Sequence, residues 1–426
     1  MTDTTISSPV RGRIASLDVI RGVAVMGIFS VNVIAFAMIF PAYMNPSAYG
    51  GYSGENLAVW LANFVLVDGK MRGLFSILFG ASMLLVIDRA EASGRSGAKT
   101  HYARMIVLLL FGLFHFYVIW FGDILALYAL TGMIAYLFHK RATKTMLAWA
   151  MGLLLASIIM FSFGASQMRK VDLAAHSPTA SAKEIRRWND NIGMLANVPA
   201  ESARDTALAL SPLPKRAEHM VTERGSEPFT SLIVFGLPTL ALMLIGMASY
   251  RSGFLTGVWD RQRYRKVALI GLGIGGAGSL VIGLWIIQSG FYLPLIFAAN
   301  LAIAVPFQVL MALGYAALII LAARPDGLLT ERIAAVGRAA FTNYLGTSII
   351  AALIFYGDGL SLFGKLSRFE AWLFVPCVWA LMLLWSKPWL DHFRYGPFEW
   401  AWRSLARWEF QPMRKRVAAR AVPAEA

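Results

Sequence analysis

The sequence has 426 residues, of which 58% are hydrophobic and only 15% are charged. Soluble globular proteins carry about 25% charged residues, so most of this chain's surface faces an apolar medium, and a lipid bilayer is the natural candidate. A net charge of +15 could indicate nucleic-acid binding, but its distribution along the chain is that of a membrane topology signal. The single cysteine, Cys377, allows neither an internal disulfide nor a cysteine metal cluster. We therefore predict a membrane protein with no nucleic-acid partner and no metal site.

The fold class predicted from the apolar stretches is an all-α membrane protein with about ten transmembrane helices, because a spanning helix needs roughly 20 apolar residues. The chain turns tightly at Phe121-Gly122-Asp123, which predicts a helical hairpin. The segment Asn56–Val67 is too short to cross, and we interpret it as an interfacial or re-entrant helix on the outer side. The predicted spans cover 17–40, 70–88, 105–121, 123–139, 146–165, 229–250, 266–287, 295–322, 333–356 and 370–386.

Lysine and arginine concentrate in alternate connections, which predicts that both ends of the chain lie in the cytoplasm. The basic connections include Arg11 and Arg13, the stretches 89–104, 140–144 and 251–266, and a tail that is basic from Lys387 to Arg420. The short connections 41–56, 121–123 and 288–294 contain no lysine or arginine. The location expected for such a chain is the bacterial cell inner membrane, with the lipid bilayer as partner.

The predicted organisation has four parts. A five-span N-terminal half (1–165) precedes a polar outer loop (166–228), followed by a five-span C-terminal half (229–386) and a basic cytoplasmic tail (387–426). Within the loop, Ala182–Leu195 is predicted as an amphipathic helix. In the tail, Gly396-Pro397 should begin a helix lying in the membrane interface. Its face would carry Phe398, Trp402 and Leu405, with Arg403 and Arg407 pointing away.

Three polar residues of the first span fall on one helical face. Asp18 and Arg21 are three residues apart, and Asn32 follows Arg21 by eleven, which places it above Arg21 about 16 Å along the axis. Ionisable side chains within spans are costly and need a partner or a cavity. This stripe is either part of a functional site or an intramembrane ion pair with a helix-packing amide.

Two further spans contain polar residues expected near mid-membrane. His115 is the first choice for a general base, because an unperturbed imidazole titrates near pH 6.5; its structural alternative is a hydrogen-bonded packing residue. Arg338 could bind phosphate from the cytoplasm, as Arg21 could, or extend to lipid headgroups. Asn343 lies about a turn beyond Arg338. We expect Arg21, Asn32, His115 and Asn343 to converge on one interior cavity.

At the outer end of the second span, Asp68, Lys70 and Arg72 form a charged cluster. Two basic residues on this side run against the positive-inside trend, so they should be compensated, either by Asp123 at the hairpin turn or by an anionic substrate. In another span, Gly271, Gly275, Ser279 and Gly283 recur every four residues and predict a groove for close helix packing.

Several segments resemble the YeiB family of bacterial membrane proteins. They are Ser16-Leu17-Asp18-Val19-Ile20-Arg21-Gly22, Leu74–Gly80, Gly112–His115 with Gly122–Leu125, Val336–Tyr344 and Gly396–Arg403. The family is distantly similar to transmembrane acyltransferases such as heparan glucosaminide acetyltransferase. The resemblance implies a shared fold and transfer of an acyl group from cytoplasmic acyl-CoA to an acceptor across the membrane. Some of those relatives carry a histidine where this chain has Asn32, and residues 41–56 lack the outer-loop histidine of the heparan enzyme.

On this hypothesis, Arg21 and Arg338, with Asp18 beside them, would receive the phosphates of acyl-CoA. Asn32 and Asn343 would orient the acyl carbonyl, and His115 would be the base. The cluster Asp68, Lys70, Arg72 and Asp123 would handle the acceptor. The alternatives are a transporter or lipid flippase that uses the same polar stripe as a pathway, and a non-catalytic membrane scaffold.

The predicted orientation is tested with reporter fusions. Fusions after Arg95, Lys144 and Arg263 should report the cytoplasm, and a fusion near Pro199 should report the periplasm, because basic connections are retained inside. Alkaline phosphatase and fluorescent-protein reporters at matched positions provide opposite readouts. A cytoplasmic signal at Pro199 would invert the orientation.

Overall fold

The computed structural model describes residues 15–324 and 326–415, and within them the chain is all-helical. Arg11, Arg13, Arg416 and Arg420 lie outside the described residues. The helices are α1 (Ala15–Ala37), α2 (Pro41–Met44), α3 (Gly54–Leu66), α4 (Lys70–Ala92), α5 (Gly97–Phe114), the π-helix η1 (His115–Ile119), α6 (Leu125–Ala135), η2 (Tyr136–Phe138), α7 (Thr143–Ala175), α8 (Ala182–Ile192), α9 (Pro199–Ala209), α10 (Leu213–Thr222), α11 (Glu227–Arg251), α12 (Arg261–Gln288), α13 (Leu293–Ala298), the π-helix η3 (Ala299–Ile303), α14 (Val305–Ala322), α15 (Leu328–Arg338), α16 (Ala340–Phe355), α17 (Arg368–Trp372), α18 (Phe374–His392) and α19 (Pro397–Arg407).

The described residues contain eight helical units long and apolar enough to cross a membrane, or nine if α15 and α16 count as one bent span. The chain is therefore a multi-pass helical membrane protein. Each of the ten predicted spans contains helix, but the number ten is not established. The segment 123–139 forms a short helix, Leu125–Phe138, and 333–356 is broken by a 79° bend. An apolar stretch in the sequence does not reveal where a helix shortens or bends.

The predicted short helix before the second span exists as α3. It joins α4 in one apolar unit of 39 residues, Gly54–Ala92. The break between them includes Gly69, whose φ of +71° is readily adopted by glycine. A Cβ at this position would also collide with the Gln308 side chain, so close packing adds a second reason for glycine. The predicted turn at Phe121-Gly122-Asp123 is confirmed, because it joins η1 to α6.

Elements from the two halves of the sequence pack side by side in one bundle, since α1 lies against α15, and α11 lies against α4, α6 and α7. Small residues allow these contacts. A Cβ on Gly22 would collide with the Ile333 backbone, and one on Gly246 with the Ile77 backbone. The predicted groove on α12 is confirmed for Gly271 and Gly275, which lie against the α14 backbone.

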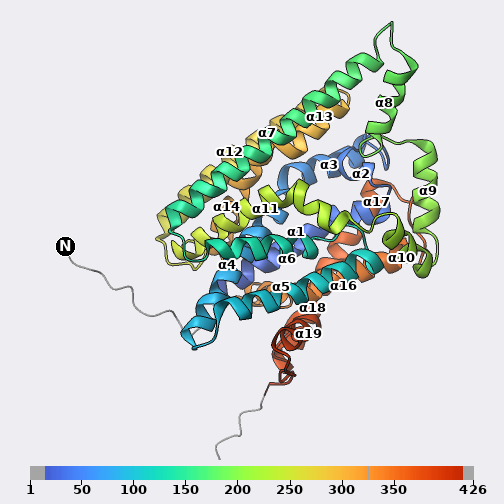
Figure 1. The fold of residues 1–426 in the computed structure, drawn as a ribbon. Coiled ribbons are helices and arrows are strands. Elements are labelled where there is room, and N and C mark those ends of the chain that lie inside the picture. Colours follow the sequence, from blue (N-terminus) through green and yellow to red (C-terminus); the bar gives the residue numbers. More distant parts are fainter. Residues whose placement is uncertain (1–14, 325, 416–426) are drawn as a thin grey trace, which may run out of the picture.

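The connections between the helices gather at two ends of the bundle (Figure 1). The helices α8, α9 and α10 gather at the right-hand side, and α8 confirms the predicted amphipathic helix, with a capping box between Ser181 and Glu184. An ion pair between Arg216 and Asp358 ties α10 to the bundle. The connections α4–α5, α6–α7 and α11–α12 carry basic residues at the other end, where Arg251 donates to the Arg141 carbonyl. We call this the basic end.

The packing of α12 on α14 is tested by two substitutions on the same helix. Gly271→Val should lower the melting temperature of the detergent-purified protein, because its side chain would enter the α14 backbone; overpacking costs about 1–3 kcal/mol. Gly273→Val is the matched control, since no atom lies within 4 Å of an added Cβ there. Equal melting temperatures for the two variants would contradict this interface.

Candidate functional site

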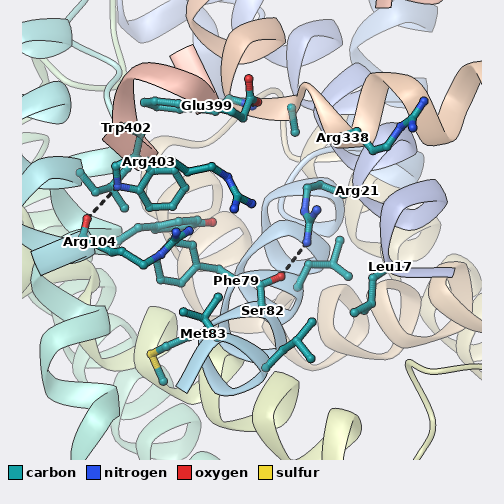
Figure 2. Close-up of a pocket in the computed structure, with 18 of the residues that line it drawn as sticks. Leu17, Arg21, Phe79, Ser82, Met83, Arg104, Arg338, Glu399, Trp402 and Arg403 are labelled. Atoms are coloured by element: carbon teal, nitrogen blue, oxygen red, sulfur yellow. Dashed lines mark hydrogen bonds between the residues drawn. The ribbon is translucent and has the colours of Figure 1, made fainter. Parts of the chain in front are cut away.

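A cavity of about 530 Å³ with a charged lining lies near the basic end. We call it the arginine cavity. Its volume lies within the range of about 300–1,000 Å³ typical of small-molecule sites. It is enclosed by α1, α4, α5, α6, the bend between α15 and α16, and α19 (Figure 2). Two carboxylates, Asp18 and Glu399, line it together with six arginines: Arg21, Arg89, Arg104, Arg338, Arg394 and Arg403.

The other lining of the arginine cavity is apolar and aromatic. It includes Phe75, Leu78, Phe79, Leu108, Leu125, Tyr128, Phe341 and Tyr344. A cavity of this kind presents charge to one part of a ligand and a hydrophobic surface to another. It therefore suits an elongated amphiphile with an anionic head, since guanidinium groups pair with phosphate or carboxylate and apolar walls accept a hydrocarbon segment.

Arg21 is held in place by two partners. Its guanidinium donates to the hydroxyl of Ser82 on α4 at 2.6 Å and to the carboxylate of Asp18 at 3.4 Å. The predicted Asp18–Arg21 pairing on one face of the first helix is thus confirmed, and both residues line the cavity. Figure 2 shows the guanidinium groups of Arg21 and Arg403 directed toward the same central space, with Arg338 farther out.

Glu399 joins α19 to the N-terminus of α16. Its carboxylate accepts hydrogen bonds from the backbone N–H groups of Phe341 at 2.6 Å and Thr342 at 3.1 Å, and from the Thr342 hydroxyl at 2.5 Å. The Thr342 hydroxyl in turn accepts from the backbone N–H of Phe398. The side chain is buried, and burial raises the pKa of the Glu399 carboxyl above its usual value. This contact fixes α19 as a wall of the cavity.

Trp402 anchors α19 on α5. Its indole N–H donates to the Arg104 carbonyl at 2.9 Å, and the Arg104 guanidinium lies 4.2 Å from the centre of its ring. Arg403 lines the arginine cavity. The sequence predicts an interfacial helix with Phe398, Trp402 and Leu405 on one face and Arg403 away from it, and α19 in addition packs on α5 and α16. Leu405 is about half exposed.

A second cavity, of about 140 Å³, contains several of the other predicted residues. We refer to it as the second cavity. Asn32, Asp68 and Arg72 line it together with Tyr43 and Trp120. Burial, with a contribution from Asp68, raises the pKa of the Tyr43 hydroxyl. Asparagine, carboxylate and guanidinium groups beside aromatic rings can bind a small polar molecule.

His115 lies between the two cavities. It is fully buried, and its Nδ1 forms a 2.9 Å hydrogen bond with the Asp123 carboxylate. Its ring lies 5.3 Å from that of Tyr344, which lines the arginine cavity, and 6.3 Å from that of Trp120, which lines the second cavity. Ile124 lines both cavities. We call His115, Trp120, Asp123, Ile124 and Tyr344 the septum.

Three buried polar atoms of the septum have no hydrogen-bond partner among the described residues: Nε2 of His115, the indole N–H of Trp120 and the hydroxyl of Tyr344. Buried polar atoms are usually satisfied, so three such atoms in one layer mark the septum as unusual. Of the two partners expected for Lys70 and Arg72, Asp123 pairs with His115 instead. Lys70 is fully buried, and its ammonium donates to the Phe64 carbonyl of α3 instead of lining the second cavity.

The predicted convergence of four side chains on one cavity is wrong. Arg21 lines the arginine cavity, Asn32 lines the second cavity, and His115 and Asn343 line neither. Asn343 is buried, and its amide donates to the Val336 carbonyl and accepts from the Trp385 indole. It therefore holds the bend between α15 and α16, which positions Arg338. Whether any of these residues acts in catalysis or binding stays a prediction.

The comparisons with known proteins place the chain in a family. A family described as "Protein of unknown function (DUF418)" matches residues 249–409. The uncharacterized protein YxaH of Bacillus subtilis is 32% identical over 95% of this chain and 97% of its own length. The uncharacterized protein YeiB of Escherichia coli K12 is 29% identical over 92% and 96%, respectively. This chain belongs to the YeiB family. No solved structure gives a significant match.

The relatives confirm the resemblance to the YeiB family that the sequence segments indicate. The DUF418 match extends from the end of α11 through α19, and so includes Arg338, Glu399 and Arg403. The other wall of the arginine cavity, with Arg21 and Ser82, lies in the part of the chain that the two full-length relatives also cover.

Several cavity residues were not identified from the sequence as site residues. In the sequence, Arg89 and Arg104 indicate only topology and no pattern distinguishes His101, yet all three line the arginine cavity. Glu399 stands within the segment Gly396–Arg403, which supported the family resemblance, but no local pattern indicates its hydrogen bonds to Phe341 and Thr342, more than 50 residues away.

The role of Glu399 is tested by its truncation. Glu399→Ala should lower the free energy of unfolding by about 1–2 kcal/mol, as for loss of a helix N-cap, since it leaves the backbone N–H groups of Phe341 and Thr342 unpaired. Thermal unfolding in detergent provides the measurement. Glu409→Ala, an exposed carboxylate just beyond α19, should have little effect; equal losses would contradict the capping role.

Proposed function

We propose that this protein transfers an acyl group from a phosphorylated thioester donor in the arginine cavity to an acceptor in the second cavity. The observation that supports this proposal is the septum: a buried His115–Asp123 pair lies between two cavities of different chemistry. The donor side is rich in arginine and apolar residues, as an acyl-CoA requires. The acceptor side combines polar and aromatic residues.

In the proposed step, an acceptor hydroxyl or amine attacks the thioester carbonyl carbon. Nε2 of His115 removes the proton from the attacking atom, while Asp123 holds Nδ1 and stabilises the imidazolium that forms. The new carbon–oxygen or carbon–nitrogen bond forms, the carbon–sulfur bond breaks, and the leaving thiolate takes the proton from the imidazolium. Since His115 is fully buried, the Tyr344 or Trp120 side chain must move aside for this reaction.

The other predicted residues have distinct places in this proposal. Arg21 and Arg338 would contact donor phosphates, with Asp18 orienting Arg21. Asn32 lies on the acceptor side with Asp68 and Arg72. Lys70, held against α3, and Asn343, held at the α15–α16 bend, would position these residues without touching a ligand.

The two cavities also support a second candidate, a transporter or lipid flippase. They are separated only by the septum, whose Ile124 lines both, so rotation of a few side chains could connect them. A transporter needs no base and releases no thiol. In both cases we propose that the basic end faces the cytoplasm of a bacterial inner membrane, in agreement with the positive-inside rule and with the bacterial origin of the relatives.

The enzyme proposal is tested with His115→Gln. In proteoliposomes with labelled acyl-CoA, this variant should lose about 100-fold or more of the thiol-release rate, because a positioned base contributes about 10²–10⁴-fold. Acyl-CoA binding should change little, since His115 does not line the arginine cavity. Arg21→Ala should instead weaken binding itself.

His392→Gln is the matched control, because this histidine is exposed at the end of α18 and should leave the rate unchanged. If the wild-type protein releases no thiol with any acceptor, and binds acyl-CoA no better than Arg21→Ala, the enzyme proposal fails. Transport that His115→Gln alters without any thiol release would favour the second candidate.

A further inference from the structure

A second basic pocket opens beside the arginine cavity, at the basic end. It has a volume of about 530 Å³ and lies between the end of α4, the first turns of α5 and the last turn of α19. We call it the vestibule. Glu409 is the single carboxylate in its lining, against six basic residues: Arg89, Arg95, Lys99, Arg104, Arg403 and Arg407.

The vestibule and the arginine cavity are neighbours with a shared wall. Arg89, Arg104 and Arg403 line both. The two volumes therefore offer one elongated ligand a continuous series of guanidinium groups. Such a ligand would have its apolar end among the aromatic residues of the arginine cavity and its charged end in the vestibule.

The one carboxylate in the vestibule's lining, Glu409, cannot balance its six basic residues. The Lys99 ammonium forms no ion pair in the described part of the chain, and Arg407 bonds to the neutral amide of Gln411. Burial lowers the pKa of Arg403, and the charges of Arg407 and Arg21 lower it further, although Tyr395 and Glu399 act in the opposite direction. Lys99 lies in the first turn of α5, where the helix dipole adds positive potential. An anion would relieve this concentration of positive charge.

We propose that the vestibule is a second phosphate-binding site, which takes a terminal phosphate of the same donor whose acyl end occupies the arginine cavity. This inference rests on the proposed function and names its substrate class: a thioester whose head carries a phosphate monoester in addition to a diphosphate, as coenzyme A does. A phosphate monoester is a dianion, and arginine and lysine bind it through charge-assisted hydrogen bonds.

Anionic phospholipid offers the same chemistry from another source, since basic pockets near a membrane surface also bind lipid headgroups. The connection to the arginine cavity favours the donor. Three of the vestibule's six basic residues also line the cavity that holds the apolar segment. A lipid bound only by its headgroup would not need that shared wall.

The experiment compares coenzyme A with dephospho-coenzyme A, which lacks the terminal monoester, for binding to the full-length protein in detergent. Wild type should bind coenzyme A about tenfold more tightly, the gain expected from one charge-assisted contact. Lys99→Ala and Arg95→Ala should reduce this ratio to about one to two, without weakening dephospho-coenzyme A. Lys140→Ala, also at the basic end but outside the vestibule, should keep the wild-type ratio.

Three results would overturn the inference: equal binding of the two ligands by wild type, an unchanged ratio in Lys99→Ala, or an equal loss of both ligands in that variant. A titration with cardiolipin, followed by the melting temperature, distinguishes a phospholipid headgroup from the coenzyme as the ligand of the vestibule. If Lys99→Ala removes stabilisation by cardiolipin but not the coenzyme ratio, the phosphate belongs to a lipid. If the protein binds coenzyme A more tightly than dephospho-coenzyme A but releases no thiol, the acyl-transfer proposal fails while the phosphate site in the vestibule stands.

Discussion

The arrangement of both cavities depends on how side chains provide hydrogen bonds to the backbone groups that a helix break leaves unpaired inside a membrane bundle. Between α15 and α16 the chain bends by 79°, and backbone groups at such a break have no water to bind in a bilayer. Glu399 accepts from the N–H groups that begin α16, and Asn343 donates to the Val336 carbonyl near the end of α15. Glu399 therefore provides hydrogen bonds to the α16 side of the break, and Asn343 provides one to the α15 side. The bend in turn places Arg338 on one arm and Phe341 and Tyr344 on the other, all lining the arginine cavity.

The same contact explains why α19 is a wall of the arginine cavity. A helix that lay only in the membrane interface would have no reason to bury a glutamate. Here Glu399 lies within the protein at 8% exposure, and Trp402 bonds to the α5 backbone. The carboxylate accepts its hydrogen bonds from α16, so it holds α19 in place as a wall of the cavity. Asp18 and Glu399 face six arginines there, and the excess of positive charge in the cavity lining is a consequence of the fold.

Sequence periodicity predicted the features of this structure that depend on residue spacing within a single helix. The Asp18–Arg21 pair, the helix at 182–192 and the small-residue face of α12 each depend on spacing within one helix. Axial alignment also placed Asn32 above Arg21, but alignment along a helix does not reveal that a septum separates the two positions. Glu399 and Thr342 are 57 residues apart, and no periodicity connects them. The pairing of His115 with Asp123 depends on the π-helix η1 at His115–Ile119, whose altered turn could not be deduced from an apolar stretch.

The septum limits which mechanisms the geometry allows. Ile124 belongs to both cavities, so the distance between them is about one side chain, yet His115 opens to neither. A permanently open path would let protons or solutes leak across the bilayer, whereas His115, the proposed base, lies behind Tyr344 and Trp120 and is exposed only when one of those rings moves. Binding in the adjoining cavity could supply that displacement, since each ring lines a cavity on one side and contacts His115 on the other. An unsatisfied Nε2 is consistent with such a resting state, because the hydrogen bond that it lacks would form only with a ligand in place.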